Sequence, residues 1–109
     1  MNNALLEKLL AFYEEDPTDP FTIYALALEY LKHDPARAGQ LFRELLRQHP
    51  TYLPTYYHAA QYFAQQEATE PAKETYAKGI ELALQQGNTK AHTELSRAYR
   101  AFLDELEDW

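Results

Sequence analysis

The sequence predicts an all-α fold of about six antiparallel helices, arranged as a solenoid of helical hairpins. Three observations lead to this prediction. Apolar residues recur three and four positions apart along the 109-residue chain, which is the spacing of one helix face. Prolines and Asp-Pro pairs separate these periodic segments. The central segment is also repeated at an offset of 33 or 34 residues, and such a period is typical of stacked helical hairpins.

The first expected helix covers residues 4–15 and belongs to an N-terminal half repeat, residues 1–17. Asn3 is the expected N-cap, because an Asn side chain accepts a hydrogen bond from the free amides of the first turn. Pro17 and Pro20 break the chain after this helix. Its apolar side consists of Leu5, Leu6, Leu9, Leu10 and Phe12. We interpret it as the second half of a preceding repeat, which would cover the exposed side of the next unit.

The first full unit covers residues 20–52 and consists of two helices joined by a tight turn. The apolar face of its first helix is Ile23, Leu26, Ala27 and Tyr30. Asp34 and Pro35 start the second helix, because Asp caps free amides and Pro suits the first helical position. The face of this second helix is Ala38, Leu41, Phe42, Leu45 and Leu46. Pro50 lies just beyond its end, where a helix can no longer continue.

The second full unit covers residues 53–86. Its apolar positions repeat those of the first unit and are Tyr56, Ala59, Ala60, Phe63, Ala72 and Tyr76. Thr69 is the expected N-cap of its second helix. Gly87 is expected to end that helix, because Gly tolerates the left-handed backbone conformation.

A last helix is expected within residues 88–109. Its apolar face is Leu95, Tyr99, Phe102 and Leu106. One apolar and one solvated face is what a terminal helix needs to cap a stack of repeats. At this length the four segments together are expected to form a single domain, residues 1–109.

The spacing in both units resembles the tetratricopeptide repeat (TPR) family, whose helix–turn–helix unit has the pattern W-x2-L-G-x2-Y, then A-x3-F, then P. The first unit places Ile23, Leu26, Ala27, Tyr30, Ala38, Phe42 and Pro50 at these positions. The second unit places Tyr56, Ala59, Ala60, Phe63, Ala72, Tyr76 and Leu84 there. The replacements are conservative in size, and the first unit is one residue shorter in its turn. The alternative is a helical bundle without repeats.

The charge and composition exclude several classes of function. A net charge of −7 argues against nucleic acid as a ligand. The N-terminus does not resemble a signal peptide, and no apolar run approaches the roughly 20 residues that span a bilayer. We therefore expect a cytoplasmic protein without a membrane segment. Residues 1–20 and 101–109 each sum to −4, whereas residues 32–50 sum to +2. We interpret these charges as solvated surfaces, with a basic face for an acidic partner as the alternative.

The sequence contains no recognisable catalytic arrangement. Cys is absent, and there is neither a Gly-rich phosphate loop nor a metal-binding His-x3-His pair. We therefore expect no enzyme activity, no cofactor and no metal. A metal or acid–base site using His58 and His92 is the alternative, although Glu94 alone does not complete a ligand set.

The resemblance implies that the first helix of each repeat lines a concave groove for a ligand. Outside the core face, these two helices carry a second stripe of residues. The expected partner-binding residues are Phe21, Tyr24, Leu28, Leu31, Tyr57, Gln61, Ala64 and Gln65. This surface suits an amphipathic helix or an extended apolar peptide. The expected function is a protein–protein interaction module, an adaptor or scaffold. Two alternatives remain: the N-terminal helix buries the stripe, or the stripe forms a homodimer.

Overall fold

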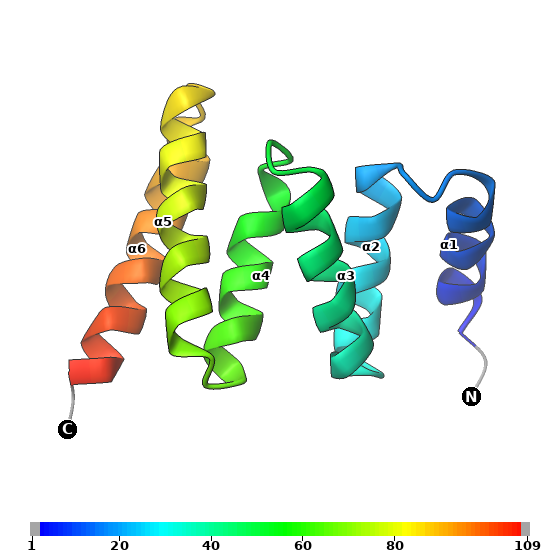
Figure 1. Ribbon diagram of the computed structural model, residues 1–109, viewed down its shortest axis with the longest axis horizontal. Helices are drawn as coiled ribbons and strands as arrows, with labels where there is room; N and C mark the ends of the chain where they lie inside the picture. The colour runs from blue at the N-terminus through cyan, green and yellow to red at the C-terminus, as the bar shows by residue number, and fades with distance from the viewer. Residues whose placement is uncertain (1–2, 108–109) are drawn as a thin grey trace. The chain divides into compact units, whose positions relative to one another are not determined.

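The computed structural model describes residues 3–107, which fold into helices joined by short turns (Figure 1). The helices are α1 (Ala4–Glu15), α2 (Pro20–Leu31), α3 (Pro35–Gln48), α4 (Pro54–Gln65), α5 (Thr69–Gln85) and α6 (Thr89–Glu107). No strand occurs between residues 3 and 107, so the expected all-α fold of about six helices is confirmed. In that same range, no helix combines the length and the apolar character that crossing a membrane requires.

The chain divides into two compact units, Met1–Thr55 and Tyr56–Trp109. The first unit contains α1, α2 and α3, and the second contains α5, α6 and nearly all of α4. The boundary lies close to the expected border between the two full repeats. That residues 1–109 form one domain remains a prediction.

The core of the first unit lies between α2 and α3, which run antiparallel (Figure 1). The fully buried apolar side chains are Ile23, Leu26, Ala27, Ala38, Leu41, Phe42 and Leu45. These are the residues that the helical spacing assigned to the core. Tyr30 and Leu46 were assigned to the same faces but are only half-buried. The two predicted helix faces are therefore confirmed except at these two positions.

Two aspartates fix where α2 and α3 begin. Asp19 caps α2, because its carboxylate accepts hydrogen bonds from the backbone N–H of Phe21 at 3.3 Å and the hydroxyl of Thr22 at 2.7 Å. The expected cap Asp34 accepts from the backbone N–H of Arg37 at 3.3 Å. A proline follows each aspartate at the start of the helix. Each cap supplies an acceptor for amides that have no partner within the helix.

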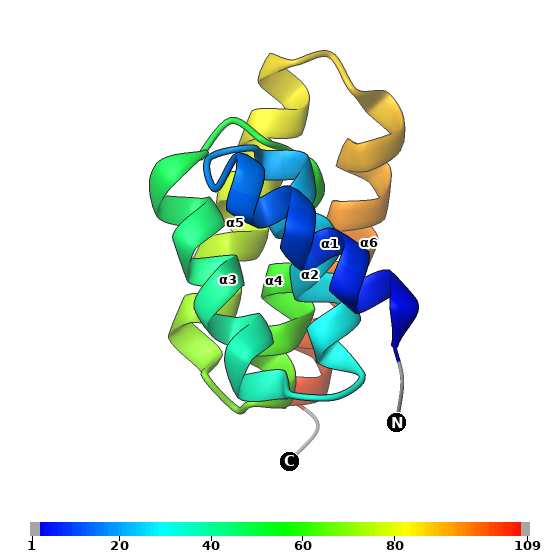
Figure 2. The same ribbon diagram turned by 90° about the vertical axis from the view of Figure 1, so that its right-hand side faces the viewer.

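Helix α1 lies across α2 (Figure 2) and is attached to it through Asn3. The side-chain oxygen of Asn3 accepts a hydrogen bond from the backbone N–H of Leu6 at 3.0 Å, so the expected cap is confirmed. The side-chain nitrogen donates to Oε1 of Glu29 at 3.1 Å. This hydrogen bond, together with Lys32, lowers the pKa of the Glu29 carboxyl group, although burial opposes the shift. One residue therefore both starts α1 and attaches it to α2.

The expected apolar side of α1 is only partly buried. Leu9 is buried, and Leu6 and Leu10 are half-buried. Leu5 and Phe12, which were assigned to the same packing side, are 53% and 49% exposed. Helix α2 therefore covers only the middle of the apolar face of α1.

The second unit packs α4 and α6 around α5. Its buried apolar residues are Tyr56, Ala59, Ala60, Tyr62, Phe63, Ala72, Tyr76, Ala83, Leu95 and Phe102. The ring of Tyr76 stacks on Tyr99 with a centroid distance of 5.4 Å and contacts Phe102 at 5.9 Å. Gly79 on α5 allows Tyr56 of α4 to approach closely. The repeat positions of the second unit are therefore buried as the sequence predicts, except Leu84, which is 69% exposed. Tyr99 and Leu106 are half-buried.

Helices α4 and α5 end in the same kind of turn. Glu67 and Gly87 have positive φ angles of 60° and 69°. In each turn, the residue that follows donates its backbone N–H to a carbonyl five residues earlier: Ala68 to Phe63 and Asn88 to Ala83, both at 2.9 Å. This is the Schellman arrangement that ends many helices. The expected role of Gly87 is confirmed.

The prediction that Thr69 caps α5 is wrong. Thr69 is the first residue of the helix, and Ala68 takes the cap position without a side-chain hydrogen bond. The left-handed conformation of Glu67 closes the preceding turn so tightly that the helix starts one residue earlier than the sequence predicts. Helix α5 therefore begins without side-chain capping.

Replacing Glu67 by Gly should raise the free energy of unfolding by about 0.5–1 kcal/mol, because Gly adopts a positive φ without the steric cost of a Cβ. Urea unfolding followed by circular dichroism measures this change. The reverse replacement, Gly87→Ala, is the matched control and should lower stability by a similar amount. A Glu67→Gly variant that is no more stable than the parent protein would contradict the expectation.

Candidate protein-binding surfaces

The second unit contains a groove of about 330 Å³ lined by α4, α5 and α6. Helix α4 contributes Tyr57, Gln61, Ala64 and Gln65. The rest of the lining is Tyr76, Ala98, Ala101, Phe102 and Glu105. The structure thus places the four α4 residues of the expected stripe around one hollow. A cleft of this size is at the lower end of the range in which proteins hold ligand groups.

A second hollow of about 340 Å³ shares Tyr57 and Ala98 with this groove. Glu94 and Arg97 complete its lining. Because both hollows include Tyr57 and Ala98, the two hollows adjoin each other along α6. The combined surface, which we call the α4–α6 groove, has an apolar and amide-bearing part next to Tyr57 and charged groups along α6.

The α6 side of this groove was not predicted from the sequence. Glu94, Ala98, Ala101 and Glu105 are spaced four, three and four residues apart, so they share one helix face. The signal that could have found them is the pair of small residues in that row, because Ala leaves space where a larger side chain would fill it. The apolar face of the same helix is the stronger pattern, and it predicts packing and not ligand binding.

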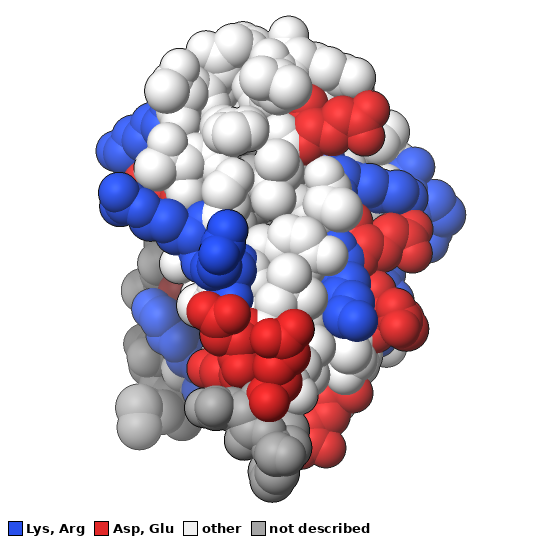
Figure 3. Space-filling model, turned by 90° about the vertical axis from the view of Figure 1, so that its left-hand side faces the viewer, with Lys and Arg blue, Asp and Glu red and all other residues white. Residues whose placement is uncertain are grey.

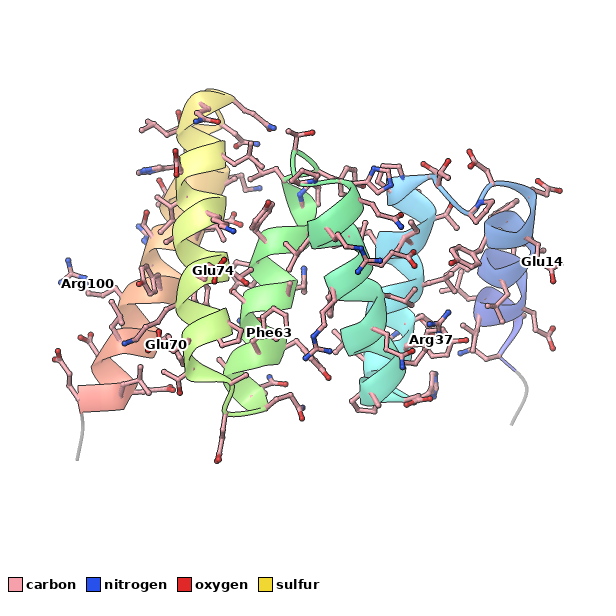
Figure 4. The ribbon with its side chains drawn as sticks, in the orientation of Figure 1. Glu14, Arg37, Phe63, Glu70, Glu74 and Arg100 are labelled. Carbon is pink, nitrogen blue, oxygen red and sulfur yellow. The ribbon has the colours of Figure 1, made fainter. Side chains whose placement is uncertain are left out.

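Figure 3 shows the side of the molecule on which α5 and α6 lie. Uncharged side chains form a band on this face. Basic side chains (Lys and Arg) and acidic side chains (Asp and Glu) lie in groups around this band. A mixed-charge surface around uncharged atoms favours a ligand that offers both apolar and polar contacts. Figure 4 shows that Arg100 points away from α6, so it provides a control position on the same helix.

The floor of the α4–α6 groove is aromatic. Burial raises the pKa of Tyr76, with smaller contributions from Tyr57 and Glu105, so its hydroxyl group stays protonated at neutral pH. Tyr57 is half-buried and contacts His58 edge-on, with ring centroids 5.5 Å apart. Burial lowers the pKa of His58, which keeps its ring neutral at pH 7. The floor of the groove therefore offers neutral aromatic groups, and the charged groups lie along α6.

The two helical histidines lie in different surroundings. His58 contacts Tyr57 on α4, whereas His92 lines a separate hollow of about 160 Å³ at the turn between α5 and α6. Within residues 3–107, no group of three His, Cys, Asp or Glu residues is placed to hold a metal ion.

The first unit carries the other half of the expected stripe, on α2. Phe21 is 64% exposed, and Tyr24, Leu28 and Leu31 are half-buried. Tyr24 contacts Tyr52 edge-on at 5.9 Å, and burial raises its pKa. Two polar residues, Thr22 and Glu29, are buried on a different face of α2. Helix α1 therefore leaves at least the Phe21 end of the stripe open.

Comparisons with known proteins support a repeat fold. No family model matches the sequence, and no curated protein matches it. A solution NMR structure of a tetratricopeptide repeat domain protein from Salinibacter ruber is 46% identical, with a TM-score of 0.75, over 80% of this chain and 89% of that one. A crystal structure of the tetratricopeptide repeat domain protein from the same organism is 45% identical, with a TM-score of 0.75, over 79% of this chain and 97% of that one.

A protein from Bordetella parapertussis shares the fold at lower identity. Its solution structure is 21% identical, with a TM-score of 0.79, over 95% of this chain and 91% of that one. The similarity extends across both units of the chain.

Proposed function

Because the chain belongs to the tetratricopeptide repeat family, we propose that it is a protein–protein interaction module that binds a peptide or helix of another protein. The observation that carries this proposal is the α4–α6 groove, which gathers Tyr57, Gln61, Ala64 and Gln65 around one hollow. Tyr57 supplies a large, rigid face with a polar tip, which is why Tyr is enriched at interfaces. The module acts by binding and not by chemistry.

The groove chemistry favours a segment with both apolar side chains and accessible backbone groups. The amides of Gln61 and Gln65 can donate to and accept from a peptide backbone. Ala98 and Ala101 leave room for a side chain of the ligand to reach the aromatic floor. Arg97 and Glu105 lie at different points along α6 and can set the direction in which a charged ligand binds.

The stripe on α2 provides a further surface of the same kind. Phe21, Tyr24, Leu28 and Leu31 lie on one helix face, and none of them is fully buried. This surface supports the alternative that the module self-associates through its apolar residues. Sedimentation velocity at several concentrations separates the alternatives, because a homodimer through the stripe would be lost in a Phe21→Ser variant.

Ala101→Arg should weaken peptide binding at least tenfold, because the long side chain would occupy the groove. Tyr57→Ala should weaken it by about 1 kcal/mol or more if this ring is a central anchor. The ligand for both measurements is a peptide selected from a displayed random library against the whole chain, and its affinity is measured by fluorescence anisotropy. Both variants should keep the helical circular dichroism spectrum.

Arg100→Ala is the matched control for Ala101→Arg, because it changes the neighbouring residue on the outward side of α6 (Figure 4). It should bind the selected peptide as the parent protein does. Tyr24→Ala tests whether the α2 stripe also takes part. If selected peptides bind Ala101→Arg and Tyr57→Ala with unchanged affinity, the α4–α6 groove is not the binding site.

A further inference from the structure

The first unit contains a second cleft, about 350 Å³ in volume, where α1 meets the start of α2. Its lining combines apolar and acidic residues: Leu9, Phe12, Glu15, Asp16, Asp19, Phe21 and Thr22. Only Phe21 also belongs to the α2 stripe. We call this hollow the α1–α2 cleft.

The apolar part of this cleft includes two of the few large hydrophobic side chains that are exposed to solvent in the described part of the chain. Among residues 3–107, the exposed large hydrophobic side chains are Leu5, Phe12, Phe21 and Leu84. Phe12 and Phe21 are 49% and 64% exposed, and both line the cleft. Leu5, Leu9 and Phe12 are spaced four and three residues apart, so they extend the apolar surface along α1. Covering two phenyl rings would remove a large apolar area from water.

The rim of the cleft is acidic. Glu15, Asp16 and Asp19 line it. Glu14 lies in the same turn of α1 but points away from α2 and does not line the cleft (Figure 4). In the part of the chain that the structure describes, the carboxylates of Glu14 and Glu15 have no hydrogen-bond or ion-pair partner. The last turn of α1 contains no basic residue, although the carbonyl end of a helix favours positive charge.

The remaining two carboxylates are bound only to uncharged donors. Asp16 accepts from the backbone N–H and the hydroxyl of Thr18, and these hydrogen bonds lower its pKa. Asp19 accepts from the N–H of Phe21 and from the hydroxyl of Thr22. Their negative charges are held in place but not neutralised. The cleft therefore combines exposed aromatic rings with a negative charge that only a basic ligand would offset.

We propose that the α1–α2 cleft binds a segment of another protein in which a large apolar side chain is flanked by Lys or Arg. The apolar side chain lies against Phe12 and Phe21, and the basic groups face Glu15 and its neighbouring carboxylates. A flanking Arg also contacts aromatic faces favourably, which suits a cleft with two phenyl rings. This cleft shares no lining residue with the α4–α6 groove, so the two surfaces can recognise segments of different chemistry.

The test uses three synthetic peptides and the full chain. The first peptide has a Leu-Trp core flanked by Lys and Arg, the second replaces each basic residue by Glu, and the third replaces the core by Ser. Fluorescence anisotropy should show binding of the first peptide alone, weakening as salt is raised because the attraction is screened. In NMR spectra of the chain, that peptide should shift the backbone amides of Phe12 and Phe21.

Two variants of the cleft are compared with two matched controls. Phe12→Ser should weaken binding of the basic peptide about tenfold, and Glu15→Gln should weaken it about threefold. Leu84→Ser removes another exposed apolar side chain, and Glu7→Gln removes another charge of α1, and both should leave binding unchanged. Circular dichroism verifies that each variant is folded.

Three outcomes would overturn the proposal. The basic peptide does not bind at millimolar concentration, or it binds equally well to Phe12→Ser and to the parent protein. Alternatively, sedimentation shows a dimer of the parent protein that Phe12→Ser abolishes, which would identify a second copy of the chain as the occupant.

Discussion

Phe42→Ala should lower the free energy of unfolding by about 3–5 kcal/mol, which is the usual cost of removing a buried phenyl ring and leaving a cavity. Phe42 is 0% exposed and lies on α3 among other fully buried side chains, including Leu41 and Leu45. It occupies the position that Tyr76 takes in the second unit. The loss should appear in urea unfolding as a lower midpoint with an unchanged slope.

Phe12→Ala is the matched control for this prediction, since it removes the same atoms from a ring that is 49% exposed. It should cost less than about 1.5 kcal/mol, because part of the ring is already in water and no closed cavity forms. Equal losses in Phe12→Ala and Phe42→Ala would mean that the core of the first unit is assigned wrongly.

Gly79→Val should lower the free energy of unfolding by about 3 kcal/mol, because it overfills a tightly packed site. A Cβ on Gly79 would lie 2.7 Å from Cβ and 3.1 Å from Cγ of Tyr56, and 3.2 Å from Cδ1 of Leu95. The contact at 2.7 Å involves the Cβ of Tyr56, which moves only with its backbone. Relieving it would therefore require α4 to shift away from α5.

Gly79→Ala provides a graded test at the same site. The new methyl group meets the same contacts, but Ala favours the helix over Gly by about 1 kcal/mol, so the net loss should be smaller than for Val. Ala77→Val controls for the lower helix propensity of Val, because Ala77 is exposed on the same helix. If Gly79→Ala stabilises the protein, the two helices do not approach as closely as this structure shows.

The core could be predicted from the sequence because it depends on local periodicity. The spacing of Ile23, Leu26 and Ala27 defines one face of α2, and all three are fully buried. Asn3 and Asp34 were predictable as caps because capping involves residues close in sequence. Thr69 failed as a cap because the left-handed backbone at Glu67 moved the start of the helix, and no residue type at that position indicated it.

Of the candidate site, only the side formed by α4 could be predicted from the sequence. Tyr57 and Gln61 lie outside the packing stripe of α4, which a helical wheel shows. Ala101 and Glu105 come from α6, far along the chain, and the sequence does not say which side of α6 meets α4. For the same reason, the sequence does not say that Phe12 and Phe21 line one cleft, because this depends on how α1 crosses α2. The one-domain organisation and the partner-binding residues stay predictions.

The attachment of α1 has a thermodynamic consequence. The rotamer of Asn3 that caps α1 through its oxygen is also the one that presents its nitrogen to Glu29. Once either interaction forms, the side-chain entropy needed for the other has already been lost. The free energies of forming α1 and of docking it are therefore linked and not additive. Helix α1 consequently gains or loses its structure and its position together, as one cooperative segment, instead of fraying residue by residue from its first turn.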